Sequence, residues 1–333
     1  MNIVNKSEIE KKGFLNFDVD KSLDIVEEIK RMRLEKNVVI LAHFYQDGKI
    51  QDIADFVGDS LGLSQQAAKT EADIILFAGV HFMAETAKIL APDKKVLIPD
   101  LQAGCSLADS CQPEDFKAFI EQHPGHTVIS YVNTTAEIKA LTDIVCTSTN
   151  ALQIVDSLPE NEKIIFAPDR NLGNYIKSVS GREMVVWDGA CHVHEKFSLE
   201  RILDIKKKHP DAQIIAHPEC EKHILIVADH IGSTTALLNY TIKDSGKTYI
   251  VATESGILHQ MQKESPGKVF IPAPPKDSSC ACNDCEYMKL ISLKKIYNTL
   301  KYELPEITLE QDLMDKARGS ILRMLEISDR LKL

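Results

Sequence analysis

Short apolar runs that end in polar residues recur three times along the chain. They cover residues 38–45, 127–133 and 213–219, and Val and Ile dominate them, as is typical of β-strands. Two further apolar runs follow each of them, and the stretches between the runs are helix-like in composition. The pattern predicts three copies of one strand–helix–strand–helix–strand–helix–strand unit.

The three copies keep a common spacing. In each copy a polar residue closes the leading run, and a serine occupies the small turn before the next helix. These residues are His43, Tyr131 and His217, followed by Ser60, Ser148 and Ser233. The polar residues are separated by 88 and 86 positions and the serines by 88 and 85, so the columns stay in register.

This alternation of strands and helices predicts an α/β fold of parallel sheets, each a three-layer sandwich with helices on both faces. Right-handed crossovers bring the carboxyl ends of all strands to one edge of a sheet. We therefore expect three homologous domains around a pseudo-threefold axis, with further helices near both ends of the chain. The predicted segments are a helical segment at 1–37, repeats at 38–111, 112–200 and 201–290, and a helical segment at 291–333.

Charge and hydropathy narrow the class of protein. The 39 basic and 49 acidic residues give a formal net charge of −10, which argues against non-specific binding to nucleic acid or to a membrane surface. No apolar stretch approaches the roughly 20 residues of a membrane span, and the first residues lack the apolar core of a signal peptide. We expect a cytoplasmic protein with reduced thiols, so its eight cysteines suggest metal or redox chemistry.

One cysteine recurs after the last apolar run of each copy. These cysteines are Cys105, Cys191 and one of the cluster Cys280, Cys282 and Cys285. Three converging thiolates suit either a zinc ion or an iron–sulfur cluster that keeps one iron open to substrate. In the third copy Cys285 is favoured because a helical run follows it directly. Burial without function is the favoured interpretation for Cys111 and Cys146, and the two interpretations are close for Cys220.

Polar pairs at the ends of the leading runs supply acid–base groups. They are His43 with Tyr45, Tyr131 with Asn133, and His217 with Glu219. Residues two apart on an extended strand point to the same face, so each pair is expected to face the site. Each serine alone is most simply a helix N-cap, but three of them at one edge would make anion sites. His192 and His194 lie next to Cys191. They could contact the ligands of a metal site, bind zinc themselves or lie at the surface. Contact with the ligands is the favoured interpretation, and His194 is the stronger candidate.

Longer motifs carry a resemblance to a known family. They include residues 40–46 (ILAHFYQ), 51–61 (QDIADFVGDSL), 79–85 (GVHFMAE) and 187–191 (WDGAC), and the order continues through 217–219 and 232–234. Over residues 20–300 the chain resembles the quinolinate synthase family. The resemblance implies the three-domain pseudo-threefold fold. It also implies condensation of iminoaspartate with dihydroxyacetone phosphate to quinolinate, phosphate and water in de novo NAD synthesis.

The resemblance further implies a cofactor and a set of site residues. A [4Fe-4S] cluster would be held by Cys105, Cys191 and Cys285, its fourth iron acting as a Lewis acid on the substrate. Catalytic roles are implied for Glu219, Tyr131, His217, Tyr45 and His194. Substrate contacts are implied for His43, Ser60, Tyr131, Asn133, Ser148, His217, Glu219, Ser233 and Thr234.

Two departures from the family pattern concern the last cysteine cluster. Glu286 stands where many members have Pro, and Cys280 is separated from Cys282 by one residue rather than two. Neither removes Cys285, but both leave a redox role of the other two cysteines undecided. An L-aspartate oxidase and iron–sulfur assembly machinery are the implied partners. The alternative functions are a zinc-thiolate lyase or hydrolase acting on small polyanions, and a non-catalytic iron–sulfur sensor.

Overall fold

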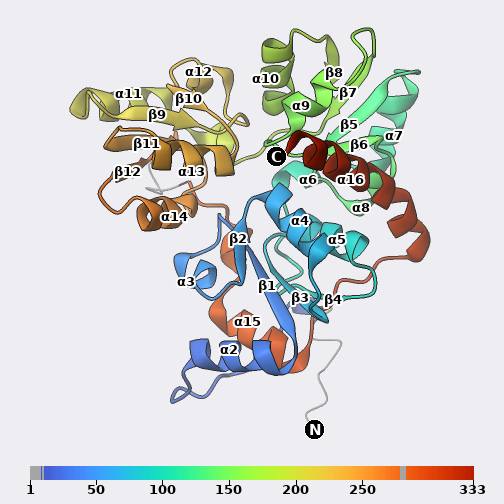
Figure 1. Cartoon of the computed structure of the whole chain (residues 1–333), viewed down its shortest axis with the longest axis vertical. Coiled ribbons are helices and arrows are strands. Elements are labelled where there is room, and N and C mark those ends of the chain that lie inside the picture. The colour runs from blue at the N-terminus through green and yellow to red at the C-terminus, as the bar shows by residue number, and fades with distance from the viewer. Residues whose placement is uncertain (1–8, 10, 278–282) are drawn as a thin grey trace. The chain divides into compact units, whose positions relative to one another are not determined.

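Three four-stranded parallel sheets repeat one topology in the computed structural model, which describes residues 9, 11–277 and 283–333 (Figure 1). The strand orders are β2-β1-β3-β4, β6-β5-β7-β8 and β10-β9-β11-β12. Every strand pair is parallel, and helices flank each sheet. The predicted threefold repeat of parallel α/β units is confirmed.

Each repeat follows the predicted order of strands and helices. The first contains β1 (Val38–His43), α3 (Gly48–Gln51), β2 (Phe56–Gly58), α4 (Ser60–Lys69), β3 (Ile74–Ala78), α5 (His81–Leu90) and β4 (Lys95–Leu97). The second contains β5 (Thr127–Tyr131), α8 (Ala136–Ala140), β6 (Ile144–Cys146), α9 (Ala151–Asp156), β7 (Ile164–Ala167), α10 (Arg170–Ser180) and β8 (Met184–Val186). The third contains β9 (Gln213–Ala216), α12 (Lys222–Leu225), β10 (His230–Ile231), α13 (Thr234–Lys243), β11 (Thr248–Ala252), α14 (Ile257–Glu264) and β12 (Val269–Pro272).

The central strands explain why the apolar runs are continuous rather than alternating. Both β3 and β7 are buried along their whole length. Parallel sheets are covered on both faces, so both faces of such a strand select apolar side chains. The hydrophobic core of each repeat is therefore centred on its sheet.

One aspartate anchors the sheet in the same way in all three repeats. Its carboxylate accepts the N–H of a residue in the leading strand at 2.7–2.9 Å, and its own N–H donates to the carbonyl of that residue. The pairs are Ile40 with Asp55, Val128 with Asp143, and Ile214 with Asp229. Each pair is 15 residues apart, so the repeat extends to side-chain hydrogen bonds that the apolar pattern did not reveal.

The leading strands end earlier than predicted. Strand β9 ends at Ala216, so His217 and Glu219 lie in a turn, and Tyr45 likewise lies beyond the end of β1. The expectation that each pair shares a face of an extended strand was therefore wrong. Instead, in the two pairs that begin with histidine, the imidazole Nδ1 accepts the backbone N–H of the second residue. The distances are 3.2 Å from the Tyr45 nitrogen to His43 Nδ1 and 3.3 Å from the Glu219 nitrogen to His217 Nδ1.

The chain divides into two compact units, Met1–Cys105 with Glu286–Asp315, and Ser106–Cys285 with Lys316–Leu333. The first holds the first sheet, and there α2 (Ile25–Glu35) packs on α15 (Leu293–Tyr302). The second holds the other two sheets, with α6 (Ser106–Asp109), α7 (Pro113–Glu121) and α11 (Leu199–Lys208). The predicted domain boundaries and the pseudo-threefold axis stay predictions.

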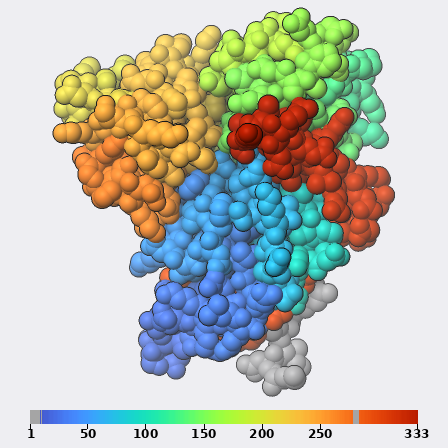
Figure 2. Space-filling view, in the orientation of Figure 1, coloured from blue at the N-terminus to red at the C-terminus, as the bar shows by residue number. Residues whose placement is uncertain are grey.

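The last helix, α16 (Gln311–Leu331), has its C-terminal part in the second unit, where it lies on the surface of the second repeat (dark red against green in Figure 2). Its Ser320 hydroxyl donates to the Lys139 carbonyl at 2.9 Å, and its Ser328 hydroxyl accepts from the Asn150 amide at 2.9 Å. Among the described residues, no helix has the length and apolar character needed to cross a membrane.

The repeated aspartate should stabilise its sheet measurably. Replacing Asp229 by Ala removes the acceptor for the Ile214 N–H, so we expect the free energy of unfolding to fall by about 1 kcal/mol. Thermal unfolding of the apoprotein followed by circular dichroism measures the change. As the control, Asp211→Ala changes an exposed acidic residue just before the same strand. Equal melting temperatures for the two variants would contradict the anchoring role.

Candidate active site

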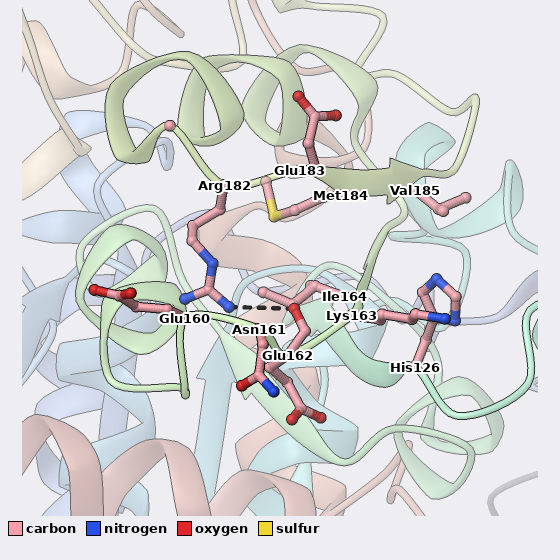
Figure 3. Close-up of a pocket in the computed structure, with 11 residues that line it drawn as sticks. His126, Glu160, Asn161, Glu162, Lys163, Ile164, Arg182, Glu183, Met184 and Val185 are labelled. Carbon is pink, nitrogen blue, oxygen red and sulfur yellow. Dashed lines mark hydrogen bonds between the residues drawn. The ribbon is translucent and has the colours of Figure 1, made fainter.

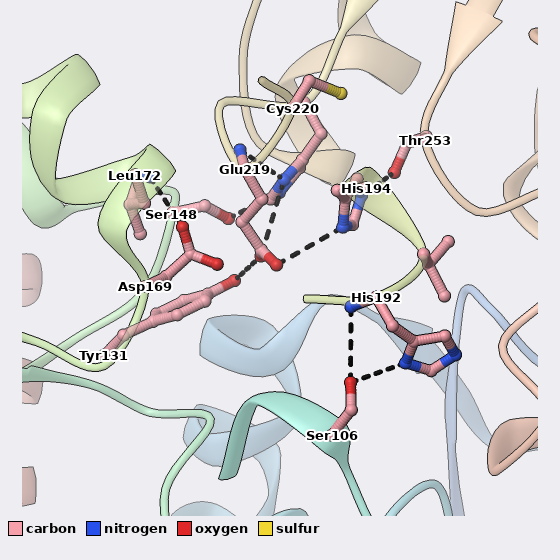
Figure 4. A network of polar contacts seen from close by, with 12 residues as sticks. Ser106, Tyr131, Ser148, Asp169, Leu172, His192, His194, Glu219, Cys220 and Thr253 are labelled. Atoms are coloured by element: carbon pink, nitrogen blue, oxygen red, sulfur yellow. Dashed lines mark hydrogen bonds and ion pairs between the residues drawn. The ribbon is translucent and has the colours of Figure 1, made fainter. Parts of the chain in front are cut away.

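The second unit gathers polar side chains around one buried carboxylate, that of Glu219 (Figure 4). The Tyr131 hydroxyl donates to Glu219 Oε1 at 2.6 Å. His194 Nδ1 lies 3.3 Å from Oε2, and His217 Nδ1 lies 3.5 Å from Oε1. The second and third repeats thus bring together four residues predicted to be catalytic from positions up to 88 residues apart.

These partners determine the ionisation of Glu219. Burial alone would raise the pKa of this carboxyl. The charge of the His194 imidazole, and then His217 and the Tyr131 hydroxyl, lower the pKa below its ordinary value. The nearby Asp169 has the opposite shift, because burial and then the charge of Glu219 raise its pKa. Glu219 is therefore ionised at neutral pH.

The turn at His217 determines the position of its proton. Because the Glu219 N–H donates to Nδ1, the neutral ring carries its proton on Nε2. That Nε2 lies 3.1 Å from the Ser148 hydroxyl, which comes from the second repeat. His217 thus connects the buried carboxylate to one of the predicted anion-binding serines.

His194 lies at the start of a short 3₁₀ helix, η1 (His194–Lys196), and its side chain is buried. Its ring stacks on that of His217 with centroids 4.8 Å apart, and its Nε2 lies 3.1 Å from the Thr253 hydroxyl. His192, two residues earlier, points elsewhere and bonds Ser106 through Nδ1 at 2.5 Å. The preference for His194 over His192 at the site agrees with this geometry.

The remaining substrate-contact candidates of the second unit lie at strand ends and helix starts. The amide oxygen of Asn133 is buried and has no hydrogen-bond partner among the described residues. Ser233 is the N-cap of α13, accepting the Ala236 N–H at 3.2 Å, and Thr234 is the buried first residue of that helix. A buried polar atom without a partner is a candidate for contact with a ligand.

His43, Tyr45 and Ser60 belong to the first unit and lie at the carboxyl edge of its sheet. The buried His43 ring contacts the Tyr45 ring edge-on, with centroids 4.5 Å apart. His43 is in register with Gly58 of the neighbouring strand, which places Ser60 at an adjacent strand end. Ser60 is the first residue of α4 rather than its cap, because Asp59 caps this helix.

The cysteines differ in burial. Cys105, Cys191 and Cys285 are partly exposed, whereas Cys111, Cys146 and Cys220 are buried. Burial raises the pKa of the Cys111 thiol to about 12 and also raises the pKa of the Cys146 and Cys220 thiols. Metal ligation needs the thiolate, so the three partly exposed cysteines suit it and the buried ones do not. Cys280 and Cys282 lie outside the described residues.

A metal could also contact the network itself. One ligand atom each from Cys191, His194 and Glu219 lie within 4.8 Å of one another. Zinc takes such sulfur, nitrogen and oxygen donors. The His194 and Glu219 atoms already face each other at 3.3 Å, so a zinc ion bound by all three residues would compete with that ion pair.

A separate hollow lies at the opposite edge of the second sheet (Figure 3). Its volume is about 570 Å³, and residues 160–164 and 181–185, which precede or begin β7 and β8, line much of it. The guanidinium of Arg182 donates there to backbone carbonyls at 2.7–3.2 Å. Arg182 therefore holds a loop closed. The predicted site residues lie at the other edge of the sheet.

Comparison with known proteins identifies the family. A family model described as quinolinate synthetase A protein matches residues 27–326. The chain belongs to the quinolinate synthase family. It is 62% identical over 305 residues to the quinolinate synthase of Microcystis aeruginosa, covering 92% of this chain and 95% of that protein. It is 54% identical over 325 residues to that of Chloroherpeton thalassium, covering 98% and 100%.

The predicted family resemblance is thereby confirmed, and the chain is an enzyme of this family. The identity to the synthase of Synechocystis, 62% over 305 residues, covers 92% of this chain and 96% of that protein. The family model matches residues of both compact units. It therefore includes both the network of the second unit and the strand-end residues of the first.

The hydroxyl of Tyr131 should hold Glu219 ionised. In Tyr131→Phe we expect the carboxyl pKa of Glu219 to rise and the free energy of unfolding to fall by about 1.5–3 kcal/mol, the range for a hydrogen bond to a charged group. Carbon-13 NMR of labelled glutamate and thermal unfolding measure the two effects. The control is Tyr175→Phe on α10. A Glu219 pKa that is unchanged in Tyr131→Phe would contradict the assignment.

Proposed function

We propose that this enzyme condenses iminoaspartate with dihydroxyacetone phosphate to quinolinate in de novo NAD synthesis. Atoms balance when one phosphate and two molecules of water leave. The observation that carries the proposal is the buried network of Tyr131, Glu219, His194 and His217 beside Cys191. Such a reaction needs repeated proton transfers near a group that assists loss of hydroxyl, and the network supplies the proton-transfer groups.

The charges of the substrates match the polar groups of the site. Two carboxylates and one phosphate must be bound, and hydroxyls, amides and helix N-termini are suitable donors for them. The proposed contacts in the second unit are Asn133, Ser148, Ser233 and Thr234, together with His217. The proposed contacts in the first unit are His43 and Ser60, with Tyr45 lining the site.

Glu219 is the proposed proton acceptor. It stays ionised because His194, His217 and Tyr131 lower its pKa against the effect of burial. The Tyr131 hydroxyl, 2.6 Å away, would pass a proton between substrate and carboxylate. His217 keeps a proton on Nε2 facing Ser148, where it can stabilise a bound anion.

We propose that Cys105, Cys191 and Cys285 hold a [4Fe-4S] cluster. When bound, the cluster would supply a Lewis acid for the loss of the last hydroxyl. Their partial exposure fits thiolate ligands. Further support comes from Ser106 and His192, which directly follow Cys105 and Cys191. The Ser106 hydroxyl bonds the His192 ring at 2.5 Å and accepts the His192 N–H at 3.3 Å, which connects the chain after one proposed ligand to the chain after another.

Iminoaspartate would come from an enzyme that oxidises L-aspartate, and the cluster from iron–sulfur assembly machinery. We place the reaction in the cytoplasm, where thiolate ligands stay reduced.

Anaerobic assay for quinolinate from the two substrates tests the proposed reaction. We expect turnover by the protein with a reconstituted cluster, and a fall of at least about 10²-fold in kcat for Glu219→Gln, because the amide cannot accept the proton. Asp211→Ala is the exposed control. Full activity of Glu219→Gln would contradict its role, and no quinolinate from the iron-containing protein would contradict the reaction.

Iron and sulfide analysis tests the cofactor. Cys105→Ser, Cys191→Ser and Cys285→Ser should each lose the cluster and its visible absorption, whereas Cys280→Ser and the buried Cys111→Ser should retain it. Stoichiometric zinc without iron would instead favour a zinc-thiolate lyase or hydrolase, for which the Cys191–His194–Glu219 group provides donors. An intact cluster without turnover would favour a sensor.

A further inference from the structure

Two buried carboxylates occupy equivalent positions in the second and third repeats. Asp169 comes two residues after the end of β7, and Glu254 comes two residues after the end of β11. Both residues are fully buried. Neither belongs to the set of proton-transfer and substrate-contact residues above, so their burial needs another explanation.

Glu254 connects the start of a helix to a cysteine. One oxygen, Oε2, accepts the Gly256 N–H at 2.7 Å, just before α14. The other oxygen, Oε1, accepts the N–H of Cys285 at 3.1 Å, from a segment 31 residues further along the chain. Both oxygens of this buried carboxylate are therefore engaged, and one of them holds the backbone of a proposed cluster ligand.

The equivalent Asp169 makes a local connection. Its Oδ1 caps α10 by accepting the Leu172 N–H at 2.7 Å. Helix capping within its own repeat accounts for this bond. In contrast to Glu254, its Oδ2 has no hydrogen-bond partner among the described residues.

We propose that Glu254 is a positioning residue that fixes the backbone of Cys285, so that its sulfur is preset for the cluster. This inference rests on the proposed ligand set. Cys285 lies outside regular helices and strands, where backbone entropy is otherwise high, and the hydrogen bond to the buried Glu254 carboxylate restrains it. The first and second repeats have Val80 and Asp169 at this position, and the proposed connection to the cysteine backbone is that of the third repeat.

The rate of iron loss from the holoenzyme tests the inference. Anaerobic protein with a reconstituted cluster is mixed with a ferrous-iron chelator, and the decay of cluster absorption is followed. Loss of a residue that supports a metal ligand typically weakens metal binding 10–100-fold, so we expect Glu254→Ala to lose iron at least about tenfold faster than the unchanged protein. The electron paramagnetic resonance spectrum of its reduced cluster should broaden as the ligand geometry varies.

The conservative variants separate geometry from charge. Glu254→Gln leaves one acceptor for two N–H groups, so its rate of iron loss should lie between those of the unchanged protein and Glu254→Ala. Asp169→Asn changes the equivalent buried carboxylate, whose oxygen can still cap α10, so it should lose iron within about twofold of the unchanged rate. Asp229→Ala removes a carboxylate–amide bond away from the cysteines and controls for general destabilisation.

Iron loss from Glu254→Ala and Glu254→Gln at the unchanged rate would overturn the inference, as would equal acceleration in Asp229→Ala. If Glu254→Ala does not fold, Glu254→Gln decides by the same rate. Failure of the proposed ligand set gives a different result, since the unchanged protein would then hold no iron–sulfur cluster at all.

Discussion

The buried carboxylate of Glu219 is the constraint on which the candidate site depends. A carboxylate removed from water is costly unless partners compensate it, so the fold must supply several at once. Tyr131 comes from the second repeat, while His194 and His217 come from either side of the third repeat's first strand. Their convergence on one side chain brings residues of the second and third repeats together within the second unit.

The same requirement is met differently by the other buried carboxylates. Asp169 and Glu254 accept hydrogen bonds from backbone N–H groups rather than from imidazoles or a phenol. Backbone donors cannot transfer protons, so these carboxylates hold structure, whereas Glu219 is surrounded by groups that can exchange protons. The type of partner, and not burial itself, distinguishes a supporting carboxylate from a catalytic candidate.

Pattern and spacing in the sequence were enough to predict the three parallel α/β repeats, because covered parallel strands require apolar runs and crossovers require helices between them. Strand ends were less predictable. The turn that holds His217 and Glu219 depends on a bond from backbone to imidazole that apolar spacing cannot reveal. Asp55, Asp143 and Asp229 each lie 15 residues after the strand residue that they anchor. This constant spacing could have been found in the sequence, but the pattern of apolar residues does not reveal it.

The sequence by itself determined the repeat, the family and the residue types available at the sheet edges, because these are properties of order along the chain. Only the tertiary structure decided which residues meet. Nothing in spacing indicates that Tyr131 touches Glu219 or that Glu254 holds Cys285. Contacts between segments 31–88 residues apart depend on how packed elements place their ends in space, and that placement is set by the whole core.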